Sequence, residues 1–309
     1  MSYCLYCGKE LISGKFCKGH NLSYRNRLIS RYNAGDTSVI SELESFGWLH
    51  HLNPTSRFTP INYVFRKFGI ELETVSTNSI PVDNMIAFAK TLHIDMRTSS
   101  YGHSTVDFWK VTTDSSLHNG YGREFVSPPF SSEEGFDQLR LISDMMEFLD
   151  IKVNSSCGFH VHLDVHDLNA KQIARIFAFY KEYELEIDKL HQNSRRGSNN
   201  SSYCNTLRGH SLDPEVITSA EGVRTVYSSR YYKVNVNPYF RQGTIEFRQH
   251  GGTCSSIKMI YWVKFCTRVI EYAKSSNRIT NSIPLFEALN LSEDEKFYWN
   301  RRMEQLRSA

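Results

Sequence analysis

Three short segments of this chain share one pattern, in which apolar residues alternate with acidic, basic or histidine side chains. The segments are residues 68–74 (FGIELET), 157–165 (CGFHVHLDV) and 243–250 (GTIEFRQH). Side chains in a β-strand point alternately to opposite faces, so each segment predicts a strand with one apolar and one polar face. The apolar faces need cover from other elements, which indicates a sheet packed against helices.

The polar faces of these three predicted strands carry residues that ligate metals or hold phosphates. They are Glu71 and Glu73 on the first, His160, His162 and Asp164 on the second, and Glu246 and Arg248 on the third. Each pair alone is explained by a solvated strand face or a surface ion pair. Three such rows in one chain favour a shared site, and carboxylates with a few imidazoles suit Mg²⁺ or Mn²⁺ holding phosphates.

The N-terminal segment carries a second and separate set of metal-ligand residues. Cys4, Cys7, Cys17 and His20 form a C-x2-C, nine residues, C-x2-H arrangement with Gly8 at a turn. Soft ligands at this spacing predict a small zinc knuckle, and four filled positions make the zinc structural rather than catalytic. Contact of this knuckle with nucleic acid or protein stays open as an alternative to a structural role.

Composition fits an ordinary globular protein without a polyanionic partner. The chain has 309 residues, 36 basic against 33 acidic side chains and a net charge of +3. No apolar run is long enough to span a bilayer, and no basic leader precedes an apolar segment, so we expect a cytoplasmic protein with no membrane partner. Four of the seven cysteines are scattered without disulfide-scaffold spacing, which agrees with this expectation.

The rest of the chain predicts helices and one long loop. Helical periodicity covers about 168–190 and 256–275, and a charged amphipathic helix covers 292–309 with Ser292 as its cap. Residues 191–222 form a polar stretch between them. Long loops are either functional or disordered, so this stretch is either a lid over a site or a disordered segment.

The ordered motifs of the chain resemble the amidoligase family, within the superfamily of glutamine synthetase and glutamate-cysteine ligase. Across roughly residues 65–275 the motifs are FGIELET, VTTDSSL with GREFVSPP, GFHVHLDV, and SRYYKVNVNP with GTIEFRQHGGT. The resemblance implies an α+β fold, a glutamine-synthetase-like antiparallel sheet flanked by helices, with the zinc knuckle added. We expect a zinc knuckle at 1–21, a helical linker at 22–60, a catalytic domain at 61–278 and a C-terminal helical extension at 279–309.

The resemblance also implies how the metal ligands are shared between two divalent ions, Mg²⁺ or Mn²⁺. Glu71, His160 and Glu246 would hold one ion, and Glu73, Asp114 and Glu124 would hold the other. The roles are carried over motif by motif, and Asp114 stands where glutamine synthetase itself has a longer carboxylate.

Three further residues match the family's phosphate and substrate contacts. His162 would lie by the nucleotide phosphates, and Arg248 would contact the transferred phosphoryl group. Arg230 matches the arginine before the strand that carries Asn235, and it would hold phosphate oxygens or a substrate carboxylate. In an unbroken strand Arg230 and Asn235 would point to opposite faces, so either a bulge intervenes or one of them points away.

The implied activity is that of an ATP-dependent ligase that joins a carboxylate to an amine. Amide or isopeptide formation would proceed through an acyl phosphate, and the carboxylate would belong to a peptide, a protein or an amino acid. The sequence contains neither a P-loop nor a dinucleotide fingerprint. Two alternatives remain open, namely a metal-dependent amide hydrolase and a nucleic-acid-binding protein with an inactive ligase domain.

Overall fold

The computed structural model describes residues 2–3, 10–11, 27–29, 31–32, 36–45, 65–76, 78–99, 105–113, 117–131, 133–196, 203–276 and 279–307. The chain divides into two compact units, Met1–Tyr63 and Val64–Ala309. Cys4, Cys7, Cys17 and His20, the predicted zinc ligands, lie outside the described residues.

The first unit contains short elements and a small apolar cluster. Its elements are β1 (Ser2–Tyr3), which pairs antiparallel with β2 (Glu10–Leu11), and η2 (Thr37–Val39) with α2 (Ile40–Ser45). The Asp36 side chain accepts a hydrogen bond of 3.0 Å from the Ser38 amide and caps η2. Leu28, Val39 and Leu43 are buried together.

The second unit is built on a sheet of seven strands. In sheet order they are β4 (Met96–Thr98), β5 (Trp109–Thr112), β6 (Tyr121–Val126), β3 (Phe68–Ser76), β7 (Gly158–Asp164), β9 (Thr244–Gly251) and β8 (Val234–Asn235). All neighbours are antiparallel except the edge pair β4 and β5, which is parallel. The predicted antiparallel sheet is therefore mixed at this edge. Parallel neighbours cannot be joined by a tight hairpin, and residues 99–108 connect β4 to β5.

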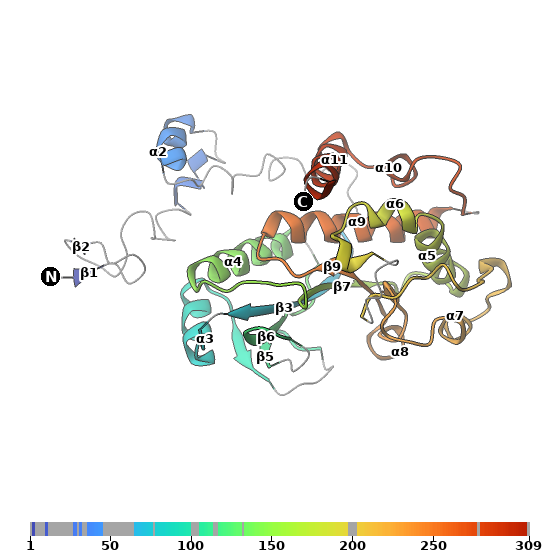
Figure 1. Cartoon of the computed structure of the whole chain (residues 1–309), viewed down its shortest axis with the longest axis horizontal. Helices are drawn as coiled ribbons and strands as arrows, with labels where there is room; N and C mark the ends of the chain where they lie inside the picture. The colour runs from blue at the N-terminus through green and yellow to red at the C-terminus, as the bar shows by residue number, and fades with distance from the viewer. Residues whose placement is uncertain are drawn as a thin grey trace. The chain divides into compact units, whose positions relative to one another are not determined.

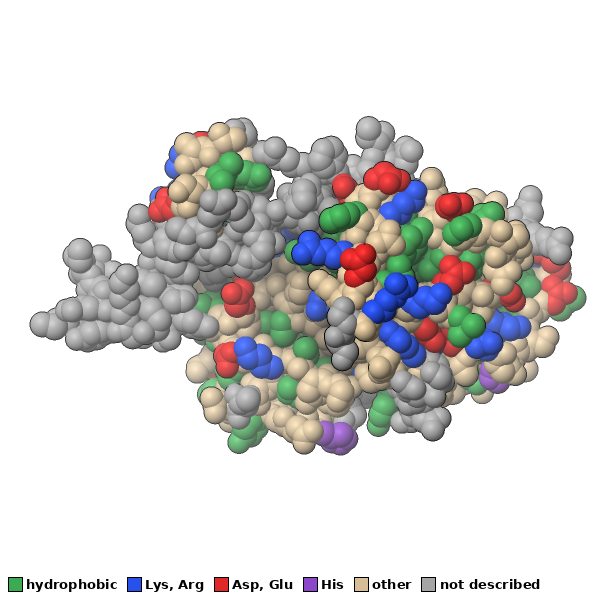
Figure 2. All heavy atoms as spheres, turned by 45° about the horizontal axis from the view of Figure 1, so that its top comes forward, with side chains coloured by type: hydrophobic (Ala, Val, Ile, Leu, Met, Phe, Trp, Pro, Cys, Tyr) green, Lys and Arg blue, Asp and Glu red, His purple; other side chains and the backbone are tan. Residues whose placement is uncertain are grey.

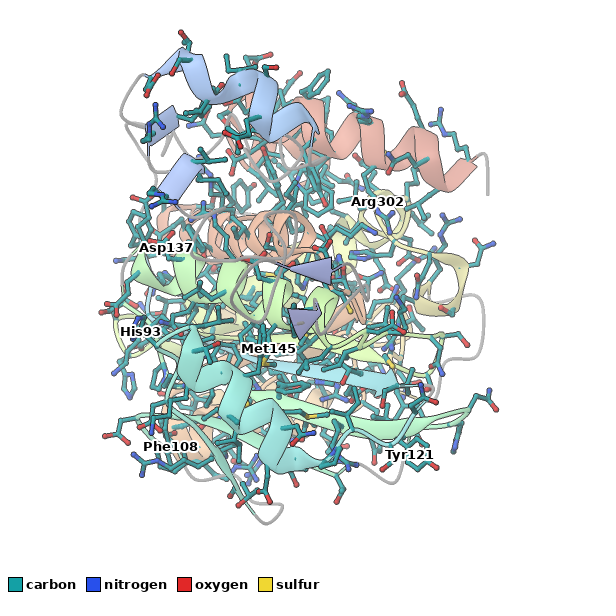
Figure 3. The ribbon with its side chains drawn as sticks, turned by 90° about the vertical axis from the view of Figure 1, so that its left-hand side faces the viewer. His93, Phe108, Tyr121, Asp137, Met145 and Arg302 are labelled. Carbon is teal, nitrogen blue, oxygen red and sulfur yellow. The ribbon has the colours of Figure 1, made fainter. Side chains whose placement is uncertain are left out.

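Helices cover one face of this sheet. The helices of the second unit are α3 (Val82–Thr91), α4 (Glu134–Phe148), α5 (Ala170–Glu182), α6 (Glu184–Asp188), η5 (Asn193–Arg195), η7 (Pro214–Val216), α7 (Ala220–Val226), α8 (Tyr239–Gln242), α9 (Ser256–Ser275), α10 (Leu285–Ala288) and α11 (Glu293–Arg307). Figure 1 shows α4 and α9 on the same side of β3, β7 and β9. Figure 3 shows α4, which carries Asp137 and Met145, lying along the sheet, with Arg302 of α11 farther out.

The predicted apolar faces of the strands point into the core beneath these helices. Leu72, Val161 and Phe247 are fully buried, as are Trp262 and Phe265 of α9. Burying such side chains removes apolar surface from water and is the main stabilising contribution to this layer. The structure confirms the three predicted strands and their alternation, and it confirms the α+β fold class.

The predicted helices are confirmed with one difference. α9 covers the predicted 256–275, and α11 begins after Ser292, whose hydroxyl accepts a 3.3 Å hydrogen bond from the Glu295 amide. The expected helix at 168–190 is two helices, α5 and α6, because the backbone of Tyr183 leaves the helical conformation. The Tyr183 hydroxyl instead donates toward the Thr280 and Ile283 carbonyls.

The predicted long polar loop is partly structured. Of residues 191–222, the structure describes 191–196 and 203–222, which contain η5, η7 and the start of α7. Whether this stretch acts as a lid stays a prediction.

Charged side chains of both signs are mixed on the outer surface of the second unit. Figure 2, with the helical side turned forward, shows Lys and Arg side chains beside Asp and Glu, separated by apolar groups. Among the described helices, none combines the length and the apolar character that crossing a membrane requires.

Candidate functional site

The face of the sheet opposite the helices carries the predicted polar row. Strand register makes Glu71 the cross-strand partner of His160, and His162 the partner of Glu246. Asn235 on β8 is in turn the partner of Glu246. Opposite residues in an antiparallel pair lie close enough for their side chains to interact. The row is therefore continuous from β3 across β7 and β9 to β8.

Three of these side chains point their ligand atoms at one small volume. Atoms of Glu71, His160 and Glu246 all lie within 4.8 Å of one another. His160 Nδ1 is 3.4 Å from Glu71 Oε2 and 3.5 Å from Glu246 Oε1. His160 and Glu246 are buried, whereas Glu71 is partly exposed, so the group is reachable from one side. We call Glu71, His160 and Glu246 the ligand triad.

The ligand triad lies in the wall of a cavity of about 890 Å³. The cavity wall also contains every other predicted site residue that the structure describes in this unit, namely Glu73, Glu124, His162, Arg230, Asn235 and Arg248. Asp114, the remaining predicted ligand, lies outside the described residues. Residues separated by up to 177 positions, from Glu71 to Arg248, thus share one concave surface.

Glu246 is held by two neighbours besides the ligand triad. Arg248 Nη1 donates to Glu246 Oε1, and Asn235 Nδ2 donates to Glu246 Oε2 at 2.6 Å. Burial favours the neutral carboxyl and is the largest single effect, yet the charges of Arg248, His162 and His160 together outweigh it and lower the pKa of Glu246. Burial would likewise lower the pKa of Arg248, but the charge of Glu246 raises it. Both groups are therefore ionised at neutral pH.

Glu71 has two histidine neighbours. His162 Nε2 lies 3.4 Å from Glu71 Oε1, whereas His160 contacts the other oxygen, Oε2. Burial acts to raise the pKa of Glu71, but hydrogen bonding to His160 and His162 lowers it well below its ordinary value. Burial acts to lower the pKa of His162, and its interaction with Glu71 raises it. An ionised Glu71 offers both carboxylate oxygens as ligands.

Glu73 and Glu124 form a second acidic position farther along β3. They are cross-strand partners in the β3–β6 pair, and both line the cavity. Glu73 Oε2 accepts a 2.5 Å hydrogen bond from the Gly158 amide, which fixes one oxygen. The structure therefore brings together two members of the second predicted ligand set, and the third, Asp114, is not described.

Arg230 and Asn235 both line the cavity. The strand contains only Val234 and Asn235, so Arg230 precedes it and strand alternation does not decide where Arg230 points. The Arg230 guanidinium lies 5.0 Å from the centre of the Tyr231 ring. Alternation along an unbroken strand had predicted opposite faces for Arg230 and Asn235. Because Arg230 lies outside the short strand, that prediction does not apply to it.

Several cavity residues were not among the predicted site residues. Lys110 and Thr112 lie on β5 at alternate positions between apolar residues, a signal of the same kind as the one at Glu71. Asp164, by contrast, was predicted on the polar face with His160 and His162, and it also lines the cavity. The alternation of β5 could have identified the first two residues, whereas His166 follows the end of β7 and carries no such signal.

Comparison with known proteins gives a family match and several matching solved structures. No curated protein matches the chain. A solved structure titled "Apo GmaS without ligand" is 12% identical, with a TM-score of 0.38, over 80% of this chain and 68% of that one. The model of the amidoligase family described as "Putative amidoligase enzyme" matches residues 65–270, about two thirds of the chain and all strands of the large sheet, so the chain belongs to this family.

Proposed function

We propose that this protein is an ATP-dependent ligase that joins a carboxylate to an amine through an acyl phosphate, with divalent metal ions in the cavity. The observation that carries the proposal is the ligand triad beside the ionised Arg248, in the wall of one cavity of a chain of the amidoligase family. A carboxylate is a poor acceptor for an amine, and phosphorylation by ATP gives it a good leaving group.

The donor set of the ligand triad fits a divalent cation. Two carboxylates and one imidazole from three adjacent strands suit Mg²⁺ or Mn²⁺, which prefer oxygen ligands and keep positions for phosphate oxygens. His162 Nε2 lies 3.4 Å from Glu71 Oε1, at the edge of the same volume. A bound cation would neutralise phosphate charge during transfer. Glu73, Glu124 and Asp114 would supply the ligands of the second metal ion of the proposed pair.

Arg248 and Arg230 are the groups proposed to handle phosphate charge. Arg248 is buried and held in place by Glu246, so its guanidinium is oriented before any ligand arrives. Arg230 lies over the Tyr231 ring at the same cavity. Guanidinium groups bind phosphate or carboxylate oxygens through two parallel N–H donors. We therefore assign Arg248 to the transferred phosphoryl group and Arg230 to phosphate or to the substrate carboxylate.

A structural zinc ion at Cys4, Cys7, Cys17 and His20 remains part of the proposal. Metal analysis of the purified chain should give one zinc ion per protein, and Cys4→Ser with Cys7→Ser should remove it. A chain that carries no zinc when purified from zinc-containing medium would exclude the knuckle.

The ligase proposal can be tested without knowing the natural amine. Hydroxylamine attacks acyl phosphates to give hydroxamates, which form coloured complexes with ferric ion. The protein would be incubated with Mg²⁺, ATP, hydroxylamine and a panel of amino acids and acidic peptides. Release of ADP and phosphate together with a hydroxamate identifies the carboxylate and supports the proposal.

Two variants separate the proposed site from the rest of the surface. Glu246→Gln removes a ligand of the triad and should abolish hydroxamate formation. Asp137→Asn is the matched control, because Asp137 is an exposed carboxylate on α4 that pairs with an arginine outside the cavity. Full activity of Glu246→Gln, or amide hydrolysis by the wild type without nucleotide, would contradict the ligase.

A further inference from the structure

Gln242, the last residue of α8, links the two edges of the large sheet. Its Oε1 accepts a 3.1 Å hydrogen bond from the Thr105 hydroxyl. Thr105 lies between β4 and β5 at one edge of the sheet, whereas α8 follows β8 at the other edge. Both residues line the cavity, so this hydrogen bond joins its opposite walls. Neither residue takes part in the proposed phosphate chemistry.

The same side-chain amide reaches the histidine beside the ligand triad. Gln242 Nε2 lies 3.4 Å from His162 Nδ1, and His162 Nε2 lies 3.4 Å from Glu71 Oε1. Three contacts in series therefore lead from Thr105, through Gln242 and His162, to a member of the ligand triad.

The direction of hydrogen bonding in this series follows from Glu71. Its ionised carboxylate only accepts, so His162 Nε2 carries a proton and donates to it. In a neutral imidazole Nδ1 then accepts, and the NH2 group of Gln242 is a donor. Turning the amide round would set its oxygen against that acceptor and lose the contact. The Thr105 hydroxyl donates to the amide oxygen and so keeps the amide in this orientation.

Thr244 on β9 makes a second contact with the same imidazole nitrogen. Its hydroxyl lies 3.4 Å from His162 Nδ1. A hydroxyl can donate or accept, so Thr244 fits either placement of the ring proton. The Gln242 amide, held by Thr105, is the group that selects one of them.

The backbone that carries Gln242 is fixed against the strand of His162. Gly243, with a φ of +67°, ends α8 and turns the chain into β9. The Gly243 carbonyl accepts a 3.0 Å hydrogen bond from the Val165 amide, just beyond the end of β7. The end of α8 and the end of β7 therefore hold each other in place.

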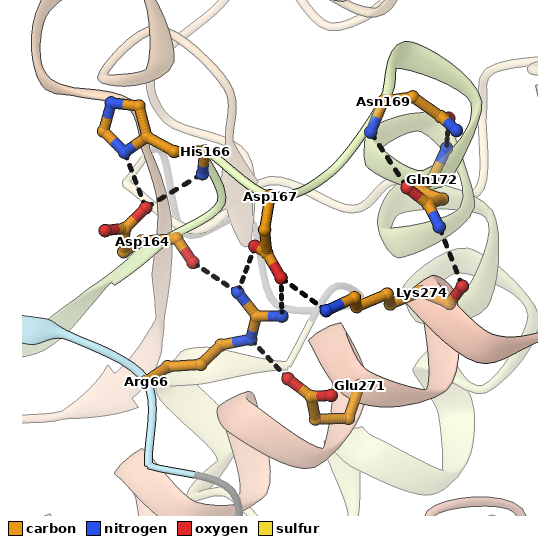
Figure 4. A network of polar contacts seen from close by, with 8 residues as sticks. All are labelled: Arg66, Asp164, His166, Asp167, Asn169, Gln172, Glu271 and Lys274. Carbon is orange, nitrogen blue, oxygen red and sulfur yellow. Dashed lines mark hydrogen bonds and ion pairs between the residues drawn. The ribbon is translucent and has the colours of Figure 1, made fainter.

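The end of β7 is in turn bound to the helical layer. Arg66 Nη1 donates to the Asp164 carbonyl at 2.9 Å and to Asp167 Oδ1 at 2.6 Å. Arg66 Nε donates to Glu271 on α9 at 2.5 Å. Figure 4 shows these contacts converging on the Arg66 guanidinium. The turn after β7 is therefore fixed, and with it the backbone next to Gln242.

We infer that Gln242 is a positioning residue of the cavity, which turns His162 toward Glu71 and so holds one carboxylate oxygen of this metal ligand in place. This inference rests on the proposed function, because it takes Glu71 to bind a divalent cation. Groups behind a metal ligand raise metal affinity by orienting it, since less freedom is lost when the ion binds.

The test measures binding of Mn²⁺ to the full chain by paramagnetic resonance titration. Removing a group that touches a metal ligand directly weakens metal binding about 10–100-fold, and Gln242 acts one contact farther away. Gln242→Leu should therefore raise the dissociation constant about three- to tenfold. Gln242 is only partly buried and Thr105 is exposed, so variants at both positions should fold.

A double-mutant cycle separates positioning from a general structural effect. Gln242→Leu should leave the dissociation constant unchanged in a His162→Ala background, because its effect passes through His162. Thr105→Val should weaken Mn²⁺ binding less than Gln242→Leu does, and it should have no effect once residue 242 is leucine. Gln305→Leu is the matched control, because Gln305 is an exposed glutamine on α11 outside the cavity, and it should bind Mn²⁺ as the wild type does.

Unchanged Mn²⁺ binding by a folded Gln242→Leu protein overturns the inference. An equal loss of affinity with and without His162 also overturns it, since the substitution would then act by another route. A wild type that binds no Mn²⁺ contradicts the metal-dependent ligase itself, and the assignment of Gln242 falls with it.

Discussion

Replacement of Lys233 by methionine should strongly destabilise the second unit. The Lys233 side chain is fully buried, and its Nζ lies 2.6 Å from Glu184 Oε1 and 2.5 Å from Asp188 Oδ1. Asp188 Oδ1 also accepts from Gln249 Nε2 at 2.5 Å, and Glu184 Oε2 accepts from the Leu207 amide at 2.9 Å. Methionine fills similar volume but removes the cation that two buried carboxylates share.

The magnitude follows from the charges that remain. Removing one partner of a buried ion pair costs about 3–5 kcal/mol, because the other charge stays desolvated. For a unit of this length, 1 kcal/mol shifts the melting temperature by about 2–4 °C, so Lys233→Met should melt about 6–20 °C below the wild type. Urea unfolding gives the free energy of unfolding, and a thermal scan by circular dichroism gives the melting temperature.

A second substitution tests whether charge, rather than packing, causes the loss. Glu184→Gln in the Lys233→Met background removes the charge of one of the two carboxylates that Lys233 binds in the wild type. It keeps a side-chain oxygen that accepts from the Leu207 amide. It should recover at least about 1 kcal/mol, within the usual range of coupling between contacting residues. A Lys233→Met protein that melts within 2 °C of the wild type, or a double variant that is no more stable than Lys233→Met, would refute this reasoning.

Three further predictions concern acid stability, backbone strain and metal binding. Burial lowers the pKa of His250 to about 3, so its contribution is complete above about pH 6.5 and is lost as pH falls, by up to about 1.4 kcal/mol per pH unit. His250→Gln should therefore flatten the fall in unfolding free energy between pH 6 and 4, and an equal slope would contradict this. Gly243→Ala should cost about 1 kcal/mol in urea unfolding, because φ is +67° and the exposed His166 ring can move from the added Cβ; a change above 3 kcal/mol would mean that the ring cannot move. Glu71→Gln and Glu246→Gln should each raise the dissociation constant for Mn²⁺ at least about tenfold in paramagnetic resonance titrations, and unchanged binding would remove them from the metal site.

Strand alternation predicted which side chains of each strand point to the cavity. Glu71 and His160 face it, whereas Leu72 and Val161 are buried under the helices, as the period of two residues requires. This part of the site depends on local sequence alone. The residues themselves therefore indicated both the polar row and the core.

The order of the strands in the sheet, and so the contacts between their side chains, could not be predicted from the sequence. Glu71 meets His160 because β3 lies next to β7, and Glu246 joins them because β9 lies next to β7 on the other side. This order is set by pairing between segments more than 80 residues apart. The strand Val234–Asn235 was also too short for its bounds to be read from alternation, and this left the direction of Arg230 open.

An irregularity in β9 is the feature that sequence alternation describes incorrectly. Between Phe159 and Val161 of β7 the register advances by two residues, whereas between His250 and Phe247 of β9 it advances by three. The extra residue is a β-bulge, which reverses the alternation. Alternation would place His250 on the cavity face with Glu246, but its ring packs against Trp262 on the helical side.

The bulge also separates two charge networks on the opposite faces of β9. Arg248 points to the cavity and binds Glu246, whereas Gln249 points to the helices and binds Asp188. The two networks are connected by one backbone hydrogen bond, in which the Arg248 amide donates to the Lys233 carbonyl at 2.8 Å. A change of side-chain charge on one face leaves this hydrogen bond in place. Substitutions at Lys233 should therefore change stability far more than metal affinity, and substitutions at Glu246 should do the reverse.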